Sequence, residues 1–187
     1  MKNELIKIWG CHGTEKSKYD SMYEIRKRNK KLPPDLGNGL YLYVLRNDNI
    51  MEPFENAMKY LNRWKPKYQE KIVVKVDISM DNDNLLNLDD VENQIIFNDF
   101  YDTNEDAIKD VLNNLDKDNT FNRGNIDGLI IEMMLKEYGI KADAVTKETF
   151  TQFYSDKRRK RSNIPNGKEF CVRNTSIISN RTICSLQ

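Results

Sequence analysis

Strand-like segments stand at both ends of this chain, and segments with helical periodicity lie between them. Apolar residues at helical spacing predict helices after Pro53, after Thr103 and between Ile126 and Gly139. Strands are predicted where apolar residues alternate with polar ones or run together, in residues 4–11, 39–45, 71–78, 168–174 and 181–186. This order of elements predicts an α+β fold.

The chain has 187 residues, of which 32% are charged and 39% are hydrophobic. This length suits one domain, so we expect residues 1–187 to form a single α+β domain. No apolar run approaches the ~20 residues that span a bilayer, and the N-terminal apolar stretch is too short for a signal peptide. The composition therefore predicts a cytoplasmic protein that makes no membrane contact.

The chain contains three cysteines, Cys11, Cys171 and Cys184, and a single histidine, His12. Without a Cys-x-x-C motif or a second histidine, the pattern argues against a zinc site and against a disulfide framework. Cys11 beside His12 raises the alternative of a thiol nucleophile. Adjacent strand residues point to opposite faces, however, so the two side chains are expected to diverge.

Half of the eight glycines fall in two short segments, one at the end of the strand predicted at 4–11 and one at the start of the strand predicted at 39–45. The first segment is Gly10-Cys11-His12-Gly13-Thr14, and the second is Gly37-Asn38-Gly39-Leu40-Tyr41. Glycine is favoured where the backbone turns sharply or approaches a ligand closely. A third segment, Gly167-Lys168-Glu169-Phe170-Cys171, opens a predicted strand near the C-terminus. Together these segments indicate a binding site built from separate strands.

The three segments supply the groups that cleavage of the nicotinamide–ribose bond of NAD requires. The bond ionises towards an oxocarbenium centre, which a nearby carboxylate stabilises. Aromatic side chains stack on the flat nicotinamide, a glycine lets the backbone reach its amide, and a histidine can bond a ribose hydroxyl. His12, Gly13, Tyr41, a second tyrosine and Glu169 form such a set.

These segments resemble the ADP-ribosyltransferases of the diphtheria-toxin and poly(ADP-ribose) polymerase type, whose signature is a His, a Tyr and a Glu on three strands. Residues 12–14 resemble the family's His-Gly-Ser/Thr strand end, residues 36–42 its Gly-x-Gly strand with the Tyr, and residues 168–172 its strand with the Glu. Residues 56–60 resemble the helix that follows the Tyr strand, and residues 76–88 a strand and turn of small bacterial members. The resemblance implies an ADP-ribosyltransferase-like fold, with two small sheets at an angle forming an NAD cleft flanked by helices.

The resemblance also implies a role for each matching residue. Glu169 would be the catalytic carboxylate, His12 would bind the NAD ribose, and Tyr41 would pack against the nicotinamide or ribose. The residues that bind NAD would be His12, Gly13, Thr14, Tyr41, Ala57 and Tyr60. The structural alternatives are a strand-end histidine, a plain turn, core or surface tyrosines, and an edge-strand glutamate that faces water.

Two positions depart from the family's pattern. Ala57 stands where many members have a serine, so one hydroxyl bond to the nicotinamide amide would be missing. Gly167, two residues before Glu169, replaces the additional carboxylate of arginine-modifying relatives, which counts against arginine as the acceptor. The acidic middle of the chain, residues 89–125, has no counterpart in the resemblance.

A basic cluster stands in the loop of residues 150–168, which precedes Glu169 and faces the acceptor in the family that this chain resembles. It consists of Lys157, Arg158, Arg159, Lys160 and Arg161, with aromatic residues just upstream. Basic side chains bind phosphate, and aromatic side chains stack on unpaired bases. We therefore expect these five residues to bind a nucleic-acid acceptor, DNA or RNA, in preference to a protein side chain.

The resemblance implies a mono-ADP-ribosyltransferase that uses NAD as its substrate and needs no metal. A small member of this type would act as an intracellular toxin or phage-defence effector, with an antitoxin as a partner. An NAD glycohydrolase that transfers the ribosyl group to water remains an alternative, because the same residues would serve it. A non-enzymatic binding module of the same fold is the less favoured alternative, because both His12 and Glu169 are present.

Overall fold

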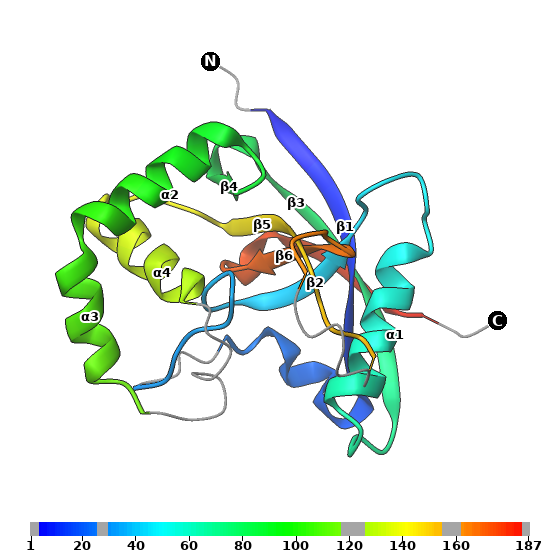
Figure 1. The fold of residues 1–187 in the computed structure, drawn as a ribbon. Coiled ribbons are helices and arrows are strands. Elements are labelled where there is room, and N and C mark those ends of the chain that lie inside the picture. Colours follow the sequence, from blue (N-terminus) through cyan, green and yellow to red (C-terminus); the bar gives the residue numbers. More distant parts are fainter. Residues whose placement is uncertain (1–3, 26–29, 117–125, 155–161, 185–187) are drawn as a thin grey trace.

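One seven-stranded sheet forms the centre of the computed structural model, which describes residues 4–25, 30–116, 126–154 and 162–184 (Figure 1). The strand order is β4-β5-β6-β2-β1-β3-β7, in which β4 and β5 are parallel and all other neighbours are antiparallel. The strands are β1 (Leu5–Glu15), β2 (Leu40–Val44), β3 (Lys71–Asp81), β4 (Leu85–Asn87), β5 (Ala144–Thr149), β6 (Gly167–Val172) and β7 (Ile178–Ile183). The described α-helices are α1 (Glu52–Trp64), α2 (Val91–Thr103), α3 (Glu105–Asn113) and α4 (Asp127–Glu137). The predicted α+β class is confirmed.

The prediction of two separate small sheets is wrong, because one mixed sheet contains all seven strands. The two halves of this sheet are nevertheless joined by a very short strand pairing. Strand β1 pairs with β3 along all eleven of its residues, but it pairs with β2 only at Gly10–Val44 and Cys11–Tyr43. Beyond Cys11 the two strands separate. A short ladder therefore joins the two halves of the sheet and leaves a gap between them.

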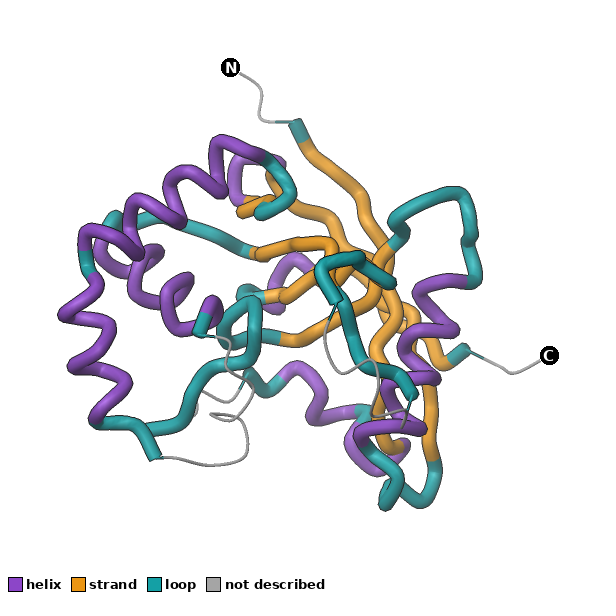
Figure 2. The backbone as a smooth tube through the Cα atoms, viewed as in Figure 1, coloured by secondary structure: helices purple, strands orange, loops and turns teal. Residues whose placement is uncertain are grey.

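Helices cover one face of the sheet at two separate places (Figures 1 and 2). Helix α1 packs on β1 and β2 through Ala57 and Leu61, in a cluster with Cys11, Tyr43 and Val73. Helix α4 packs with α2 over β5 and β6. The register puts Tyr41, Tyr43, Glu169 and Cys171 on this same face, since directly paired residues share a side of a sheet. The strip that contains Tyr43 and Glu169 thus lies between α1 and α4.

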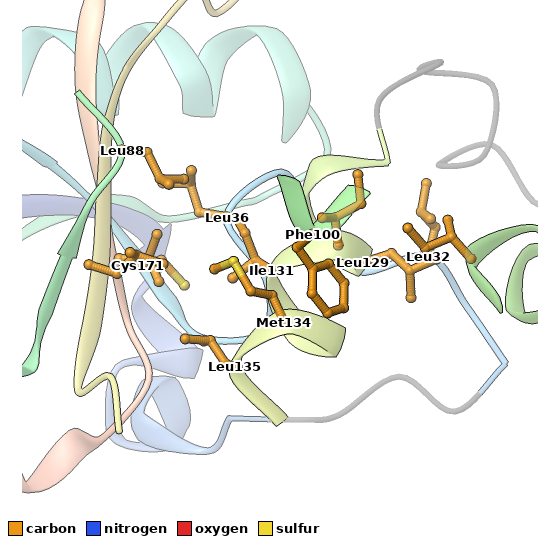
Figure 3. Close-up of a cluster of buried hydrophobic side chains, with 13 residues drawn as sticks. Leu32, Leu36, Leu88, Phe100, Leu129, Ile131, Met134, Leu135 and Cys171 are labelled. Carbon is orange, nitrogen blue, oxygen red and sulfur yellow. The ribbon is translucent and has the colours of Figure 1, made fainter. Parts of the chain in front are cut away.

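The core under α4 anchors the turn at residues 37–39. Figure 3 shows Leu36 in one cluster with Leu129, Ile131 and Met134 of α4 and Phe100 of α2. All five side chains are nearly or completely buried. Cys171 of β6 belongs to the same cluster. The turn that precedes β2 is therefore held in place by apolar packing against α4.

The opposite face of the sheet holds a second core. Leu40, Leu42 and Val44 of β2 alternate with the tyrosines and pack with Phe170 of β6. The short 3-10 segments of residues 16–23 contribute Met22 and cover part of this face. No helix in the described part of the chain is long and apolar enough to cross a bilayer.

Candidate active site

A cleft of about 660 Å³ lies where β1 and β2 separate. It is lined by His12, Gly13 and Thr14 from β1, by Tyr41 from β2, by Tyr60 from α1 and by Glu169 from β6. These are six of the seven residues that the sequence predicts for catalysis or NAD binding. The structure therefore brings them together although they span 158 positions of the chain, from 12 to 169.

The His12 side chain bridges the gap between the two strands. Its Nδ1 lies 2.8 Å from the backbone carbonyl oxygen of Tyr41. Because a carbonyl can only accept, Nδ1 must carry the proton and Nε2 is left as an acceptor. Within the described residues, Nε2 has no hydrogen-bond partner. Burial lowers the pKa of His12 below its ordinary value of 6.5, and the opposite effect of the bond to Tyr41 is smaller. The ring is therefore neutral near pH 7.

Tyr41 uses its hydroxyl to hold the neighbouring turn. The hydroxyl donates to the carbonyl of Gly37 and accepts the amide proton of Leu36, each over 2.8 Å. Burial raises the pKa of Tyr41 far above its ordinary value, so the group stays protonated. Tyr41 lines the cleft, and its hydroxyl is already bonded to the backbone of residues 36 and 37. A contact of Tyr41 with NAD would therefore not use the hydroxyl.

An ion pair fixes the same turn from the side of α4. Arg173 forms a two-pronged salt bridge with Glu132, whose Oε1 also accepts the amide proton of Asn38 over 2.7 Å. Burial raises the pKa of Glu132, but the bonds from Arg173 and Asn38 outweigh it and hold the pKa below its ordinary value. Gly37 adopts a φ of +86°, and a Cβ there would lie 2.5 Å from Oε1 of Glu132. A side chain at position 37 would disrupt this arrangement.

Gly13 has a packing role beside its place in the cleft. A Cβ at this position would lie 2.8 Å from the carbonyl oxygen of Ala57 and 2.7 Å from Cγ of Leu61. The absence of a side chain therefore lets α1 approach β1 closely. Ala57 is completely buried under this contact and does not line the cleft. Of the seven residues that the sequence predicts for catalysis or NAD binding, Ala57 is thus the one that lies in the core and not in the cleft.

Glu169 lies between two side chains that the sequence did not single out. The register pairs it directly with Tyr43 of β2 on one side and with Lys147 of β5 on the other. Burial, then the charge of Glu169, raises the pKa of Tyr43 well above its ordinary value. The Tyr43 hydroxyl therefore stays protonated; it donates to the Thr151 hydroxyl over 3.3 Å and also lies beside Glu169. Tyr43 could have been found from its spacing, because residues 41 and 43 share one face of a strand.

Hydrogen bonds of Asn166 hold the segment that precedes Glu169. The Asn166 side chain exchanges two hydrogen bonds of 2.8 Å with the backbone of Thr151, and Asn56 of α1 donates to the Asn166 carbonyl over 3.2 Å. A Cβ at Gly167 would lie 2.8 Å from Nδ2 of Asn56. The position two residues before Glu169 is therefore filled by Asn56, which explains why it is a glycine. The predicted acceptor-binding residues Lys157, Arg158, Arg159, Lys160 and Arg161 lie outside the described residues.

The cleft combines a neutral histidine, aromatic residues, the three carboxylate residues Glu24, Asp35 and Glu169, and Lys65. These groups can bond a sugar hydroxyl, stack on a planar ring, stabilise a developing positive charge and attract a phosphate. Within the residues that the structure describes, no three His, Cys, Asp or Glu side chains are grouped so as to hold a metal ion. Comparisons of the chain with protein-family models, with curated proteins and with solved structures found no match.

Proposed function

We propose that this protein is a mono-ADP-ribosyltransferase that cleaves the nicotinamide–ribose bond of NAD and transfers ADP-ribose to a macromolecular acceptor. One observation carries the proposal: His12, Tyr41 and Glu169 come from three strands far apart in the sequence and line the same cleft. The same three residues carry the sequence resemblance to the His-Tyr-Glu ADP-ribosyltransferases. An ADP-ribosyltransferase-like fold, with the NAD cleft between the two halves of one sheet, is part of the proposal.

In the proposed reaction, the bond between the ribose C1′ and the nicotinamide nitrogen breaks, and its electron pair goes to the nicotinamide. Positive charge then develops on the ribose, and the Glu169 carboxylate stabilises it. The Tyr43 hydroxyl, next to Glu169, helps to orient that carboxylate. Tyr60 and the ring of Tyr41 supply the surfaces against which the nicotinamide and ribose pack.

His12 serves substrate binding in this proposal. Its protonated Nδ1 is committed to the Tyr41 carbonyl, so Nε2 can accept a hydrogen bond from a ribose hydroxyl. Lys65, which lines the same cleft, supplies a positive charge for the pyrophosphate of NAD. Both contacts are made in the ground state as well as in the transition state, so they contribute mainly to NAD affinity.

The acceptor in this proposal is nucleic acid, on the strength of the basic cluster at residues 157–161. Modification of a protein side chain is the alternative acceptor class. The resemblance to small bacterial members supports a role as a toxin or phage-defence effector, for which an antitoxin would be a partner.

NAD hydrolysis is the second candidate, and one observation favours it. The space beside Gly167 is filled by Asn56, so no second carboxylate can stand two residues before Glu169 to bind an arginine acceptor there. Water needs no such contact. The residues that would cleave NAD are the same in both candidates, so only the fate of the ribosyl group separates them.

Nicotinamide release from NAD tests the proposal. We expect release by the wild-type chain and a loss of roughly a hundredfold in kcat for Glu169→Gln, because the lost charge acts on the transition state. The affinity for NAD should change by only a few-fold. Glu55→Gln, in an exposed ion pair of α1, is the matched control and should release nicotinamide at the wild-type rate. An active Glu169→Gln enzyme would contradict the proposed role.

A further inference from the structure

A second cavity meets the NAD cleft at Glu169. Its volume is about 910 Å³, and it shares Asp35, Tyr60 and Glu169 with the cleft. The strands β5 and β6 contribute Lys147, Thr149 and Glu169, which the register puts on one face of the sheet. A molecule in the second cavity would therefore approach the ribose of a bound NAD beside Glu169.

The lining of this cavity favours a planar group that can form hydrogen bonds. Three aromatic residues, Tyr60, Trp64 and Phe150, contribute to its wall, and aromatic side chains stack on flat rings. Among the described lining residues, the carboxylates are Asp35, Asp89, Asp127, Glu148 and Glu169, and Lys147 is the lysine or arginine. Asp89 is paired with Lys168 over 2.9 Å.

Lys147 favours a nucleobase over a guanidinium group as the ligand of this cavity. Within the part of the chain that the structure describes, its ammonium group forms no ion pair, although it is the cross-strand neighbour of Glu169. A guanidinium of an arginine side chain only donates hydrogen bonds, and it would be repelled by Lys147. A nucleobase has both acceptor and donor atoms on its edge, so it can bond Lys147 and a carboxylate at the same time.

We propose that the acceptor is an unpaired nucleobase, which stacks in the second cavity and presents a nitrogen to the ribose of NAD beside Glu169. This inference rests on the proposed cleavage of NAD. The lone pair of the base nitrogen forms the new bond to C1′, and the bond from C1′ to nicotinamide breaks with its electron pair on the leaving nicotinamide. The proton lost from the base nitrogen goes to a carboxylate of the cavity and then to water.

Four acceptors, offered to the full-length chain together with NAD labelled in its adenylate part, test the inference. They are a mixed-sequence single-stranded oligonucleotide, its duplex, an abasic oligonucleotide of the same length and the guanidine compound agmatine. We expect label on the single strand, at least tenfold less on the duplex because its bases are stacked and paired, and none on the abasic strand. Nicotinamide release is measured in every sample.

The outcomes distinguish a failure of the nucleobase acceptor from a failure of the proposed NAD cleavage. Label on agmatine or on the abasic strand would overturn the nucleobase as acceptor, as would nicotinamide release that yields only free ADP-ribose with every acceptor. In these cases NAD cleavage would stand. No nicotinamide release in any sample would overturn the proposed function, and the inference with it.

A charge variant of the cavity gives a second test. For Lys147→Met, we expect the ratio of labelled oligonucleotide to free ADP-ribose to fall at least tenfold, because the base loses its donor. A cationic acceptor would instead gain from the removal of this charge. Lys136→Met, at an exposed lysine of α4 that lines neither cavity, should keep the wild-type ratio. An unchanged or raised ratio in Lys147→Met would contradict the nucleobase assignment.

Discussion

His12 donates its Nδ1 proton to the backbone carbonyl of Tyr41 over 2.8 Å, and this bond crosses the gap between β1 and β2. The backbone ladder between the two strands ends one residue earlier, at Cys11. At the point where the cleft opens, the His12 side chain therefore forms the hydrogen bond between the two strands that backbone groups form further along. This link ties the geometry of the cleft to the side chain of a single residue.

The stability of the protein should depend on this histidine at mildly acidic pH. Because the pKa of His12 is lowered in the folded state, the unfolded chain binds its proton first as the pH falls below the ordinary value of 6.5. We expect the free energy of unfolding to be constant above that pH and to decrease below it. Urea unfolding between pH 7.5 and 5.5 measures this slope.

The control for this prediction is a His12→Gln variant. The chain has one histidine, so the variant removes the group that titrates in this window. The slope between pH 6.5 and 5.5 should become flatter in His12→Gln. Equal slopes in the two proteins would show that the histidine has an ordinary pKa in the folded state.

Tyr43→Phe should reduce catalysis more than binding. The change removes the hydroxyl next to Glu169 and keeps the ring that packs against Phe153. We expect kcat for nicotinamide release to fall about tenfold and the affinity for NAD to stay within about twofold, since the lost hydroxyl lies beside the carboxylate and helps to orient it. Tyr138→Phe, at an exposed tyrosine of α4's C-terminal end, is the control. A change in affinity alone would place Tyr43 in substrate binding instead.

Arg173→Met should destabilise the fold and weaken NAD binding together. It leaves the partly buried Glu132 without its partner, and a pair of this exposure is worth about 2 kcal/mol, between the values for surface and buried pairs. The Asn38 amide would lose part of its support, so the turn that precedes Tyr41 would loosen. Urea unfolding and NAD titration check both effects. Stability loss without any effect on NAD binding would separate this ion pair from the site.

Gly13→Ala should lower stability by about 1–3 kcal/mol, because the new methyl group overlaps Leu61 and the Ala57 carbonyl. The variant Gly13→Ala with Leu61→Val tests this cause, because the smaller side chain removes one of the two overlaps. The combined loss should then be less than the sum of the two single losses. Strict additivity, measured by thermal unfolding, would contradict a steric origin.

The basic cluster should act on the acceptor and not on NAD. Neutralising Lys157, Arg158, Arg159, Lys160 and Arg161 together should reduce transfer to an oligonucleotide. Wild-type transfer should fall steeply with salt because bound cations are released from the phosphates, and the variant should show a shallower slope. Transfer assays between 50 and 200 mM salt measure both slopes. Equal slopes would argue against phosphate binding by these residues.

Local sequence patterns predicted most elements that pack through a regular apolar face. The helix after Pro53 appears as α1, with proline in its first turn, and the strand predicted at 71–78 lies within β3. Gly139 has a φ of +63° just after α4, as the predicted helix end requires. In these segments, propensity and burial favour the same structure.

The sequence patterns missed α2 and β5 for a shared physical reason. Helix α2 leaves Val91, Ile95 and Ile96 exposed and buries only Phe100 fully, so its apolar residues form no stripe. Strand β5 begins with buried Ala144 and Val145, but its second half lines a cavity and is polar. Periodicity reports on a face that meets a core, and neither element has such a face along its length.

By itself, the sequence determined the α+β class and the three segments that carry His12, Tyr41 and Glu169, because strand propensity and glycine turns are local properties. Only the tertiary structure decided that β1 leaves β2 after two paired positions, that Ala57 lies in the core and that Tyr43 and Lys147 flank Glu169. These facts depend on strand order and register. Pairing between distant strands follows from how the whole sheet buries its two faces, which no local segment encodes.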